Sequence, residues 1–212
     1  MDPVQEYIES FLAFDNQRLP AIDADHDRLE VQPSVGPEVG KLLGLLVRAT
    51  GARRVLELGS ALGYSAVWLA EALRVTGGTL VSIEQDEARF REASRNIEAA
   101  GCAGIVRLVR GDAEEELERL EGSFDLILQD SAKPLYPKLL ERCVALTRPG
   151  GLIVADDALF KPRGVAERFS APVHQYNERA FAHPLLYSTI LPVGDGVTIS
   201  VKLAGPRTGC YP

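Results

Sequence analysis

The sequence predicts an α/β protein built on a doubly wound, mostly parallel sheet. From about residue 53 to residue 157, short apolar segments alternate with amphipathic segments of helix length. Strands that are apolar throughout are typical of a parallel sheet with helices on both faces. The 212 residues fit a single domain, with a helical N-terminal segment over 1–50 and the sheet over 51–212.

The predicted elements follow one another in a regular order. We expect strands over 53–60, 78–86, 104–112, 124–130 and 151–157, and helices over 64–75, 87–100, 113–122 and 134–147. Gly101 ends the second of these helices, and RPGG (148–151) is expected to turn the chain into the fifth strand. The GDG triplet (194–196) predicts a C-terminal hairpin over 185–203. Ahead of the sheet we expect one helix near 3–15, a polar loop and a helix over 37–50.

Composition restricts the function classes. The net charge of −7 gives no overall electrostatic footprint for nucleic acid. No apolar stretch reaches the roughly 20 residues that cross a bilayer, and the acidic, amphipathic N-terminus lacks the features of a signal peptide. Cys102, Cys143 and Cys210 show no metal-ligand spacing, so we expect reduced thiols and a cytoplasmic protein without a membrane partner.

The loop after the first strand has the character of a ligand-binding turn. Gly59 and Gly63 allow close approach of a ligand to the backbone, and the following helix offers free N–H groups. The order G-x-x-x-G, with Ala61 in the middle, is not the dinucleotide fingerprint, and tight-turn glycines without a ligand are the alternative. Glu57 ends the first strand near this loop, and Glu84 ends the second, where a carboxylate accepts both ribose hydroxyls. These groups fit S-adenosylmethionine better than NAD.

Three aspartates end the fourth and fifth strands. Asp130 follows one strand, and Asp156 and Asp157 follow its expected neighbour, so all three face the same crevice. Adjacent carboxylates raise one another's pKa unless a cation joins them, and a hard divalent ion prefers such oxygen ligands. Separately solvated aspartates are the alternative. Lys133 is either a general base, if a cation and burial depress its pKa, or an ion-pair partner of Asp130.

Five motifs together resemble the cation-dependent class I O-methyltransferases, which include catechol and caffeoyl-CoA O-methyltransferases and small bacterial relatives. The motifs occur in the order of that family between about residues 31 and 203: LELGSALGYSAVWLA, GDAEEEL, FDLILQDSAK, RPGGLIVADDALF and LPVGDGVTISVK. The resemblance implies a Rossmann-like sheet of seven strands, mostly parallel, with a C-terminal antiparallel hairpin and N-terminal helices.

The resemblance also implies where S-adenosylmethionine binds. Its methionine part is expected against the loop, with Glu57 near the amine, Glu84 on the ribose and Asp112 and Ala113 beside the adenine. Val35 matches the segment that closes over the cofactor. The remaining expected cofactor contacts are Gly59, Ser60, Gly63, Tyr64, Ser65 and Asp130. As alternatives, Ser65 and Asp112 are only helix N-caps.

By the same resemblance, Asp130, Asp156 and Asp157 are metal ligands, and Lys133, with Asp130, is catalytic. We expect Mg²⁺, with Mn²⁺ or Ca²⁺ as alternatives. Asp157 departs from the asparagine common in the family. Ala132 stands where the animal catechol enzymes carry a tryptophan that stacks on adenine, and no glutamate in 161–177 is an obvious grip for a second hydroxyl.

The leading hypothesis is an S-adenosylmethionine- and metal-dependent O-methyltransferase for a small, catechol-like acceptor with vicinal hydroxyls. The alternative acceptor is a hydroxyuridine at the wobble position of tRNA, for which Arg163 and Arg168 beside the crevice are the only support. A cofactor-binding protein without catalysis and an NAD-dependent oxidoreductase fit the motifs less well. A homodimer is expected from the family.

Overall fold

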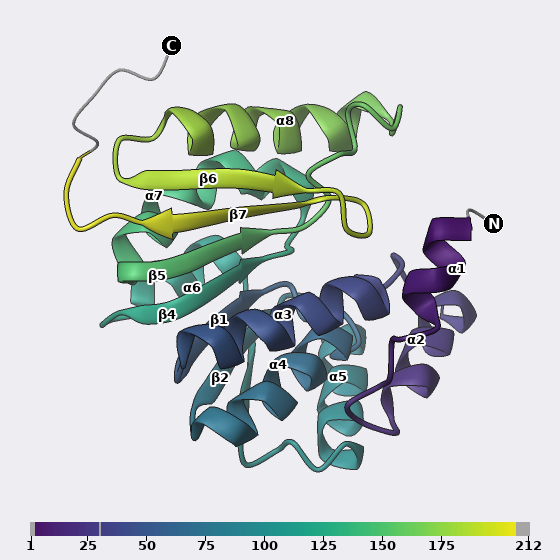
Figure 1. Ribbon diagram of the computed structural model, residues 1–212. Helices are drawn as coiled ribbons and strands as arrows, with labels where there is room; N and C mark the ends of the chain where they lie inside the picture. Colours follow the sequence, from purple (N-terminus) through teal and green to yellow (C-terminus); the bar gives the residue numbers. More distant parts are fainter. Residues whose placement is uncertain (1–2, 30, 207–212) are drawn as a thin grey trace.

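A computed structural model describes residues 3–29 and 31–206. In this part of the chain, seven strands form one sheet in the order β3-β2-β1-β4-β5-β7-β6 (Figure 1). The first five strands pair in parallel, and β7 runs antiparallel to both β5 and β6, so the predicted fold class is confirmed. The strands are β1 (Arg54–Leu58), β2 (Thr79–Glu84), β3 (Val106–Arg110), β4 (Phe124–Gln129), β5 (Thr147–Ala155), β6 (Leu186–Leu191) and β7 (Val197–Lys202).

Helices cover both faces of the sheet (Figure 1). One face packs against α3 (Gly36–Thr50), α4 (Tyr64–Thr76) and α5 (Glu87–Ala99). The other packs against α6 (Ala113–Arg119), α7 (Tyr136–Leu146) and α8 (Glu167–Ala182). Side chains of successive strand residues point to opposite faces, so Val55 joins the first core and Leu56 the second. The strands are therefore buried on both sides, which is why they read as continuous apolar segments.

The N-terminal region differs from the prediction. The first helix, α1, spans only Pro3–Glu9, and a further helix, α2 (Leu19–Arg28), occupies the expected polar loop. The side chain of Asn16 accepts a hydrogen bond from the Arg18 backbone N–H at 2.9 Å, which fixes the turn that enters α2. Leu19 and Ile22 are completely buried in the core. The rest of α2 is polar, so these two buried side chains were too few to predict a helix from the sequence.

Two further differences lie on the C-terminal side. Residues 148–151, predicted to be a turn, lie inside β5, which starts at Thr147 and carries a register shift against β4. Gly150, with φ of 76°, allows this irregular backbone. The helix α8 was not predicted; it contains Pro172, a residue that normally argues against a helix interior.

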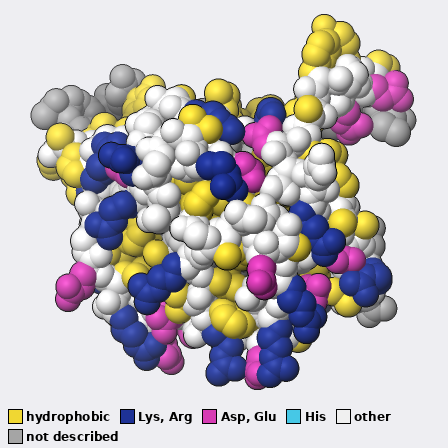
Figure 2. Space-filling view, turned by 90° about the horizontal axis from the view of Figure 1, so that it is seen from below, with side chains coloured by type: hydrophobic (Ala, Val, Ile, Leu, Met, Phe, Trp, Pro, Cys, Tyr) yellow, Lys and Arg dark blue, Asp and Glu magenta, His cyan; other side chains and the backbone are white. Residues whose placement is uncertain are grey.

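The surface view from below shows α1 projecting from the body of the protein, with apolar side chains on its surface (Figure 2). On this face Lys and Arg side chains are interspersed with acidic and apolar groups. Within the described residues, no helix is both long and apolar enough to span a membrane. Cys102 and Cys143 are buried free thiols, and Cys210 lies outside the described residues.

Close packing of α3 on α4 gives a test of the fold. A methyl group at Gly40 would overlap the buried Trp68 indole, whereas one at Gly44 would meet only the movable end of Arg48, 2.9 Å away. We expect Gly40→Ala to lower the free energy of unfolding by about 1–3 kcal/mol, the usual cost of overpacking. The matched variant Gly44→Ala is expected to be neutral or stabilising because alanine favours a helix. Urea denaturation of both variants checks this; equal stability would contradict the packing.

Candidate active site

Two adjoining pockets open at the carboxyl ends of the parallel strands. The first, here the glycine-loop pocket, is lined by Gly59, Glu84 and Ala113 among others. The second, here the aspartate pocket, has a volume of about 300 Å³ and is lined by the three strand-end aspartates and by Lys133. Residues Gln32, Ala61 and Asp130 line both pockets, so a ligand in one lies directly beside a ligand in the other.

The glycine loop has a backbone that few sequences can adopt. Gly59, Ala61 and Gly63 have φ values of 95°, 46° and 87°. A side chain at Gly59 would also overlap the carbonyl group of Asp130, so this glycine is required both for the turn and for the close approach of β1 to the end of β4. The Ala61 N–H donates to Glu84 Oε2 at 2.8 Å, which fixes the loop against β2.

Glu84 is a rigid wall of the glycine-loop pocket. Its side chain is buried, and Oε1 accepts hydrogen bonds from the Asp86 N–H at 2.8 Å and from Arg89 Nε at 3.1 Å. The carboxylate therefore has one orientation before any ligand arrives. The sequence did not identify Arg89, because its contact with Glu84 depends on how α5 packs beside the end of β2.

Glu57 lies beneath the glycine loop rather than on its surface. It is completely buried, and its carboxylate accepts hydrogen bonds from the hydroxyls of Ser65, at 2.5 Å, and Ser82. Burial raises the pKa of Glu57 to about 7, against the opposing effect of these two hydrogen bonds. The alternative that Ser65 is an N-cap is wrong, because the cap of α4 is Gly63. Glu57 and Ser65 line neither of the two pockets, so a role of Glu57 near the amine of the cofactor stays a prediction.

The other expected cofactor residues have different surroundings. Ser60 and Tyr64 are buried. Val35 lines the aspartate pocket, not the glycine-loop pocket. Asp112 caps α6 by accepting hydrogen bonds from the N–H groups of the next turn at 2.8 and 3.3 Å, and its expected place beside the adenine stays a prediction. Ala113 lines the glycine-loop pocket.

The sheet brings the three aspartates together. Gln129 pairs with Ala155 in the parallel ladder, so the residues that follow, Asp130 and Asp156, leave β4 and β5 side by side. Asp157 adopts a left-handed backbone with φ of 63°, which an aspartate tolerates better than most residues. One carboxylate oxygen from each aspartate lies within 4.8 Å of the other two.

The electrostatics of this cluster fit a cation. Burial, and then the charges of Asp130 and Asp157, raise the pKa of Asp156 well above its ordinary value, and burial raises that of Asp157 to about 6. Within the described residues, the buried Oδ1 of Asp156 has no hydrogen-bond partner. An unpartnered buried carboxylate oxygen is unfavourable. An all-oxygen donor set of this kind is suited to Mg²⁺, Mn²⁺ or Ca²⁺.

Lys133 is buried at the edge of the cluster. Its Nζ lies 3.0 Å from Asp130 Oδ1, forms an ion pair with Asp157 and donates to the hydroxyl of Tyr136 at 3.0 Å. Burial favours the neutral amine, but the charges of its neighbours raise the pKa of Lys133 well above its ordinary value. The protein groups alone therefore do not depress this pKa; the expected depression depends on the positive charge of a cation and stays a prediction.

Tyr136 is a site residue that the sequence reading missed. It is completely buried against Tyr176, and its hydroxyl accepts from Lys133 and donates to Asp130 Oδ1 at 3.4 Å. Burial raises the pKa of Tyr136 well above its ordinary value, so the phenol stays protonated. The spacing of three residues from Lys133 was the available signal, because residues three apart share one side of a helical turn.

Comparison with known proteins places the chain in a family. The sequence model of the O-methyltransferase family matches residues 18–203. A catechol O-methyltransferase of Niastella koreensis is 33% identical over 214 residues, covering 94% of this chain and 96% of that protein. A catechol O-methyltransferase of Mycobacterium tuberculosis is 34% identical and covers 74% of this chain and 71% of its own length.

Solved structures agree with these sequence matches. An O-methyltransferase from Streptomyces achromogenes, in complex with S-adenosylmethionine, superimposes with a TM-score of 0.85 at 28% identity, over 95% of this chain and 96% of that one. An O-methyltransferase from Bacillus cereus, in complex with S-adenosylhomocysteine, has a TM-score of 0.82 at 28% identity, with 94% and 96% coverage. The chain therefore belongs to the O-methyltransferase family and is an S-adenosylmethionine-dependent methyltransferase.

Proposed function

We propose that this enzyme methylates a small aromatic acceptor with two adjacent hydroxyl groups and that it requires a divalent cation. The observation that carries the proposal is the aspartate cluster, in which a buried Asp156 oxygen lacks a partner beside two further carboxylates. Two adjacent hydroxyls are the acceptor groups that can share one cation. The relatives named catechol O-methyltransferase support the same acceptor class.

The roles of the residues follow from their positions. Asp130, Asp156 and Asp157 would hold the cation. When bound, a divalent cation lowers the pKa of a coordinated hydroxyl and that of a neighbouring ammonium. Lys133 Nζ, once it has released its own proton to solvent, would receive the acceptor's proton, and Tyr136 would fix the direction of the amine through the 3.0 Å hydrogen bond. Asp157, in place of the asparagine common in the family, adds one negative charge that favours cation binding.

The lining residues of the two pockets support one substrate in each. We assign S-adenosylmethionine to the glycine-loop pocket, with Glu84 on the ribose, and the acceptor to the aspartate pocket. The side chains of Val35, Phe160 and Val165 give the aspartate pocket apolar lining, which suits one aromatic ring in a volume of about 300 Å³. Because Asp130 lines both pockets, this assignment would put the acceptor oxygen beside the methyl group, as an in-line displacement requires.

The alternative acceptor, a hydroxyuridine in tRNA, has less support. Arg163, one of its two candidate contacts, forms an ion pair with Asp195 at 3.1 Å and donates to the Gly194 carbonyl at 2.7 Å. The guanidinium of Arg168 lies 4.7 Å from the centre of the Phe169 ring. Both groups are thus engaged within the chain, although an exposed ion pair of this kind is weak and exchangeable.

We also propose a homodimer in which α1 contributes to the interface. Among the apolar side chains of the N-terminal segment, Val4, Tyr7 and Phe11 are at least 63% exposed. A neighbouring groove is lined by Ile8, Leu12, Leu42, Leu45, Pro192 and Val193, together with the charged side chains of Asp15, Glu38, Lys41 and Arg48. Exposed apolar side chains on a projecting helix beside such a groove fit burial against a second copy of the chain.

Metal removal tests the proposed reaction. The protein is incubated with labelled S-adenosylmethionine and either a set of catechols or bulk tRNA, with EDTA and then with Mg²⁺ restored. We expect label on a catechol, loss of transfer in EDTA and recovery with Mg²⁺. Undiminished transfer after full chelation would exclude the metal role, and label on tRNA alone would exclude the acceptor class.

The role of Lys133 is tested by removing its amine. At saturating Mg²⁺, Lys133→Ala is expected to lower kcat by about 10²–10⁴-fold, the range of general base catalysis, with the Kd for S-adenosylmethionine unchanged. Lys138→Ala, which removes an exposed amine from α7, is the matched control and should retain full activity. If Lys133→Ala keeps the wild-type kcat, Lys133 is not a general base and serves only as an ion-pair partner.

The dimer is tested by light scattering coupled to gel filtration. Wild-type protein is expected at twice the mass of one chain, and Tyr7→Ser, within α1, at the mass of a single chain, because a small polar group replaces an aromatic contact in the interface. Val75→Ser changes a side chain of nearly equal exposure on α4 and should leave the dimer intact. A monomeric wild-type protein, or dissociation by Val75→Ser as well, would refute the assignment of α1.

A further inference from the structure

A buried side-chain amide connects the N-terminal segment to the glycine loop. Asn96 on α5 is completely buried. Its Nδ2 donates to the Leu62 carbonyl at 2.9 Å, and its Oδ1 accepts from Arg18 Nη2 at 2.9 Å. A guanidinium can only donate and a carbonyl can only accept, so the amide has a single satisfied orientation. Asn96 therefore connects Arg18 to the glycine loop through one hydrogen bond on each side of its amide.

The loop needs such support because its backbone is strained. Ala61 has a side chain yet holds φ of 46°, a conformation that persists only when the surroundings impose it. From the sheet side, Glu84 accepts the Ala61 N–H at 2.8 Å. From the helix side, Asn96 holds the carbonyl of the next residue, Leu62, at 2.9 Å. The loop is thus clamped at consecutive residues by two side chains from different elements.

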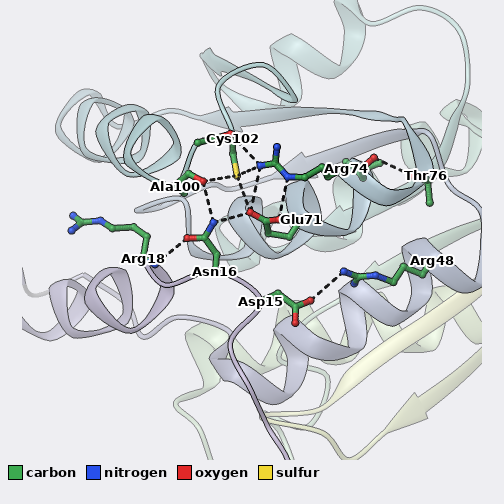
Figure 3. A network of polar contacts seen from close by, with 11 residues as sticks. Asp15, Asn16, Arg18, Arg48, Glu71, Arg74, Thr76, Ala100 and Cys102 are labelled. Atoms are coloured by element: carbon green, nitrogen blue, oxygen red, sulfur yellow. Dashed lines mark hydrogen bonds and ion pairs between the residues drawn. The ribbon is translucent and has the colours of Figure 1, made fainter.

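The segment that carries Arg18 is itself docked on the body of the protein. Figure 3 shows Asn16 pointing at Glu71 and at the Ala100 carbonyl, with hydrogen bonds of 2.7 and 3.0 Å. Asp15 pairs with Arg48 at 3.3 Å and with Lys41 at 2.6 Å. These contacts join residues 15–18 to α3, α4 and the end of α5. Arg18 is thus presented to Asn96 by an anchored segment.

We propose that Asn96 is a positioning residue for S-adenosylmethionine and that Arg18 holds it in the working orientation. The inference rests on the assignment of the glycine loop to the cofactor made above. Arg18 and Asn96 touch neither substrate; they fix the loop in the conformation that receives the cofactor. The N-terminal segment therefore contributes to cofactor affinity through a specific chain of hydrogen bonds and not only through general stability.

Calorimetric titration of S-adenosylmethionine into the full chain tests this link. Arg18→Met removes the donor and keeps the length of the side chain. Asn96→Asp keeps the acceptor for Arg18 and the shape of the side chain but removes the donor to Leu62, so it serves if Arg18→Met does not fold. Each variant is expected to raise Kd about 3- to 10-fold, the effect of one net hydrogen bond. For Arg18→Met, kcat at saturating cofactor should stay at the wild-type value while the KM for cofactor rises.

The matched control is Ser188→Ala, which removes two hydrogen bonds on β6 and contacts neither Arg18 nor Asn96. It should lower Tm yet leave Kd unchanged within about twofold. Unchanged Kd in Arg18→Met and Asn96→Asp, or an equal rise in Ser188→Ala, would overturn the proposal. Glu84→Ala is the reference for the site. If it bound the cofactor like wild type, the site assignment itself would fail, and the inference with it.

Discussion

The mutual repulsion of three buried or half-buried aspartates is the constraint on which this active site depends. Asp130, Asp156 and Asp157 meet because β4 and β5 are parallel neighbours that end at the same edge of the sheet. Lys133 offsets part of their charge through its ion pairs with Asp130 and Asp157. The remaining negative charge is unfavourable for folding unless a cation shares it. In the proposed function, the same cation both offsets this charge and serves the reaction.

The second constraint is the close approach of the glycine loop to the aspartate cluster. Gly59 packs so closely on the carbonyl group of Asp130 that no side chain fits between them. The consequence is that the two pockets share a wall at Asp130. On the proposed assignment of the pockets, the backbone of these two adjacent strands would bring the methyl donor and the acceptor together. Rigid placement of this kind is what makes methyl transfer between two bound molecules efficient.

The sequence was sufficient for the sheet and for the residues at the strand ends. Uniformly apolar strands predicted a parallel sheet. The aspartates that directly follow β4 and β5 predicted that their charges would meet at one edge of the sheet. It was insufficient where a role depends on packing between elements distant in sequence. The helix α2 is polar except for an edge that α4 covers. The role of Asn96 depends on its hydrogen bond with Arg18, 78 residues earlier in the chain. Ser65 was expected to contact the cofactor, with a helix cap as the alternative, and the sequence did not show that its hydroxyl donates to the buried carboxylate of Glu57.

The most direct test of the account is calorimetric titration of Mg²⁺ into the protein bound to S-adenosylhomocysteine, at pH 6 in buffers of different ionisation enthalpy. The account predicts one ion per chain, together with release of protons, because ligand carboxylates with raised pKa values must ionise to bind the metal. Asp156→Asn should bind the ion much more weakly. Absence of saturable binding by the wild-type protein, or equal binding by Asp156→Asn, would contradict the claim that the three aspartates form a cation site.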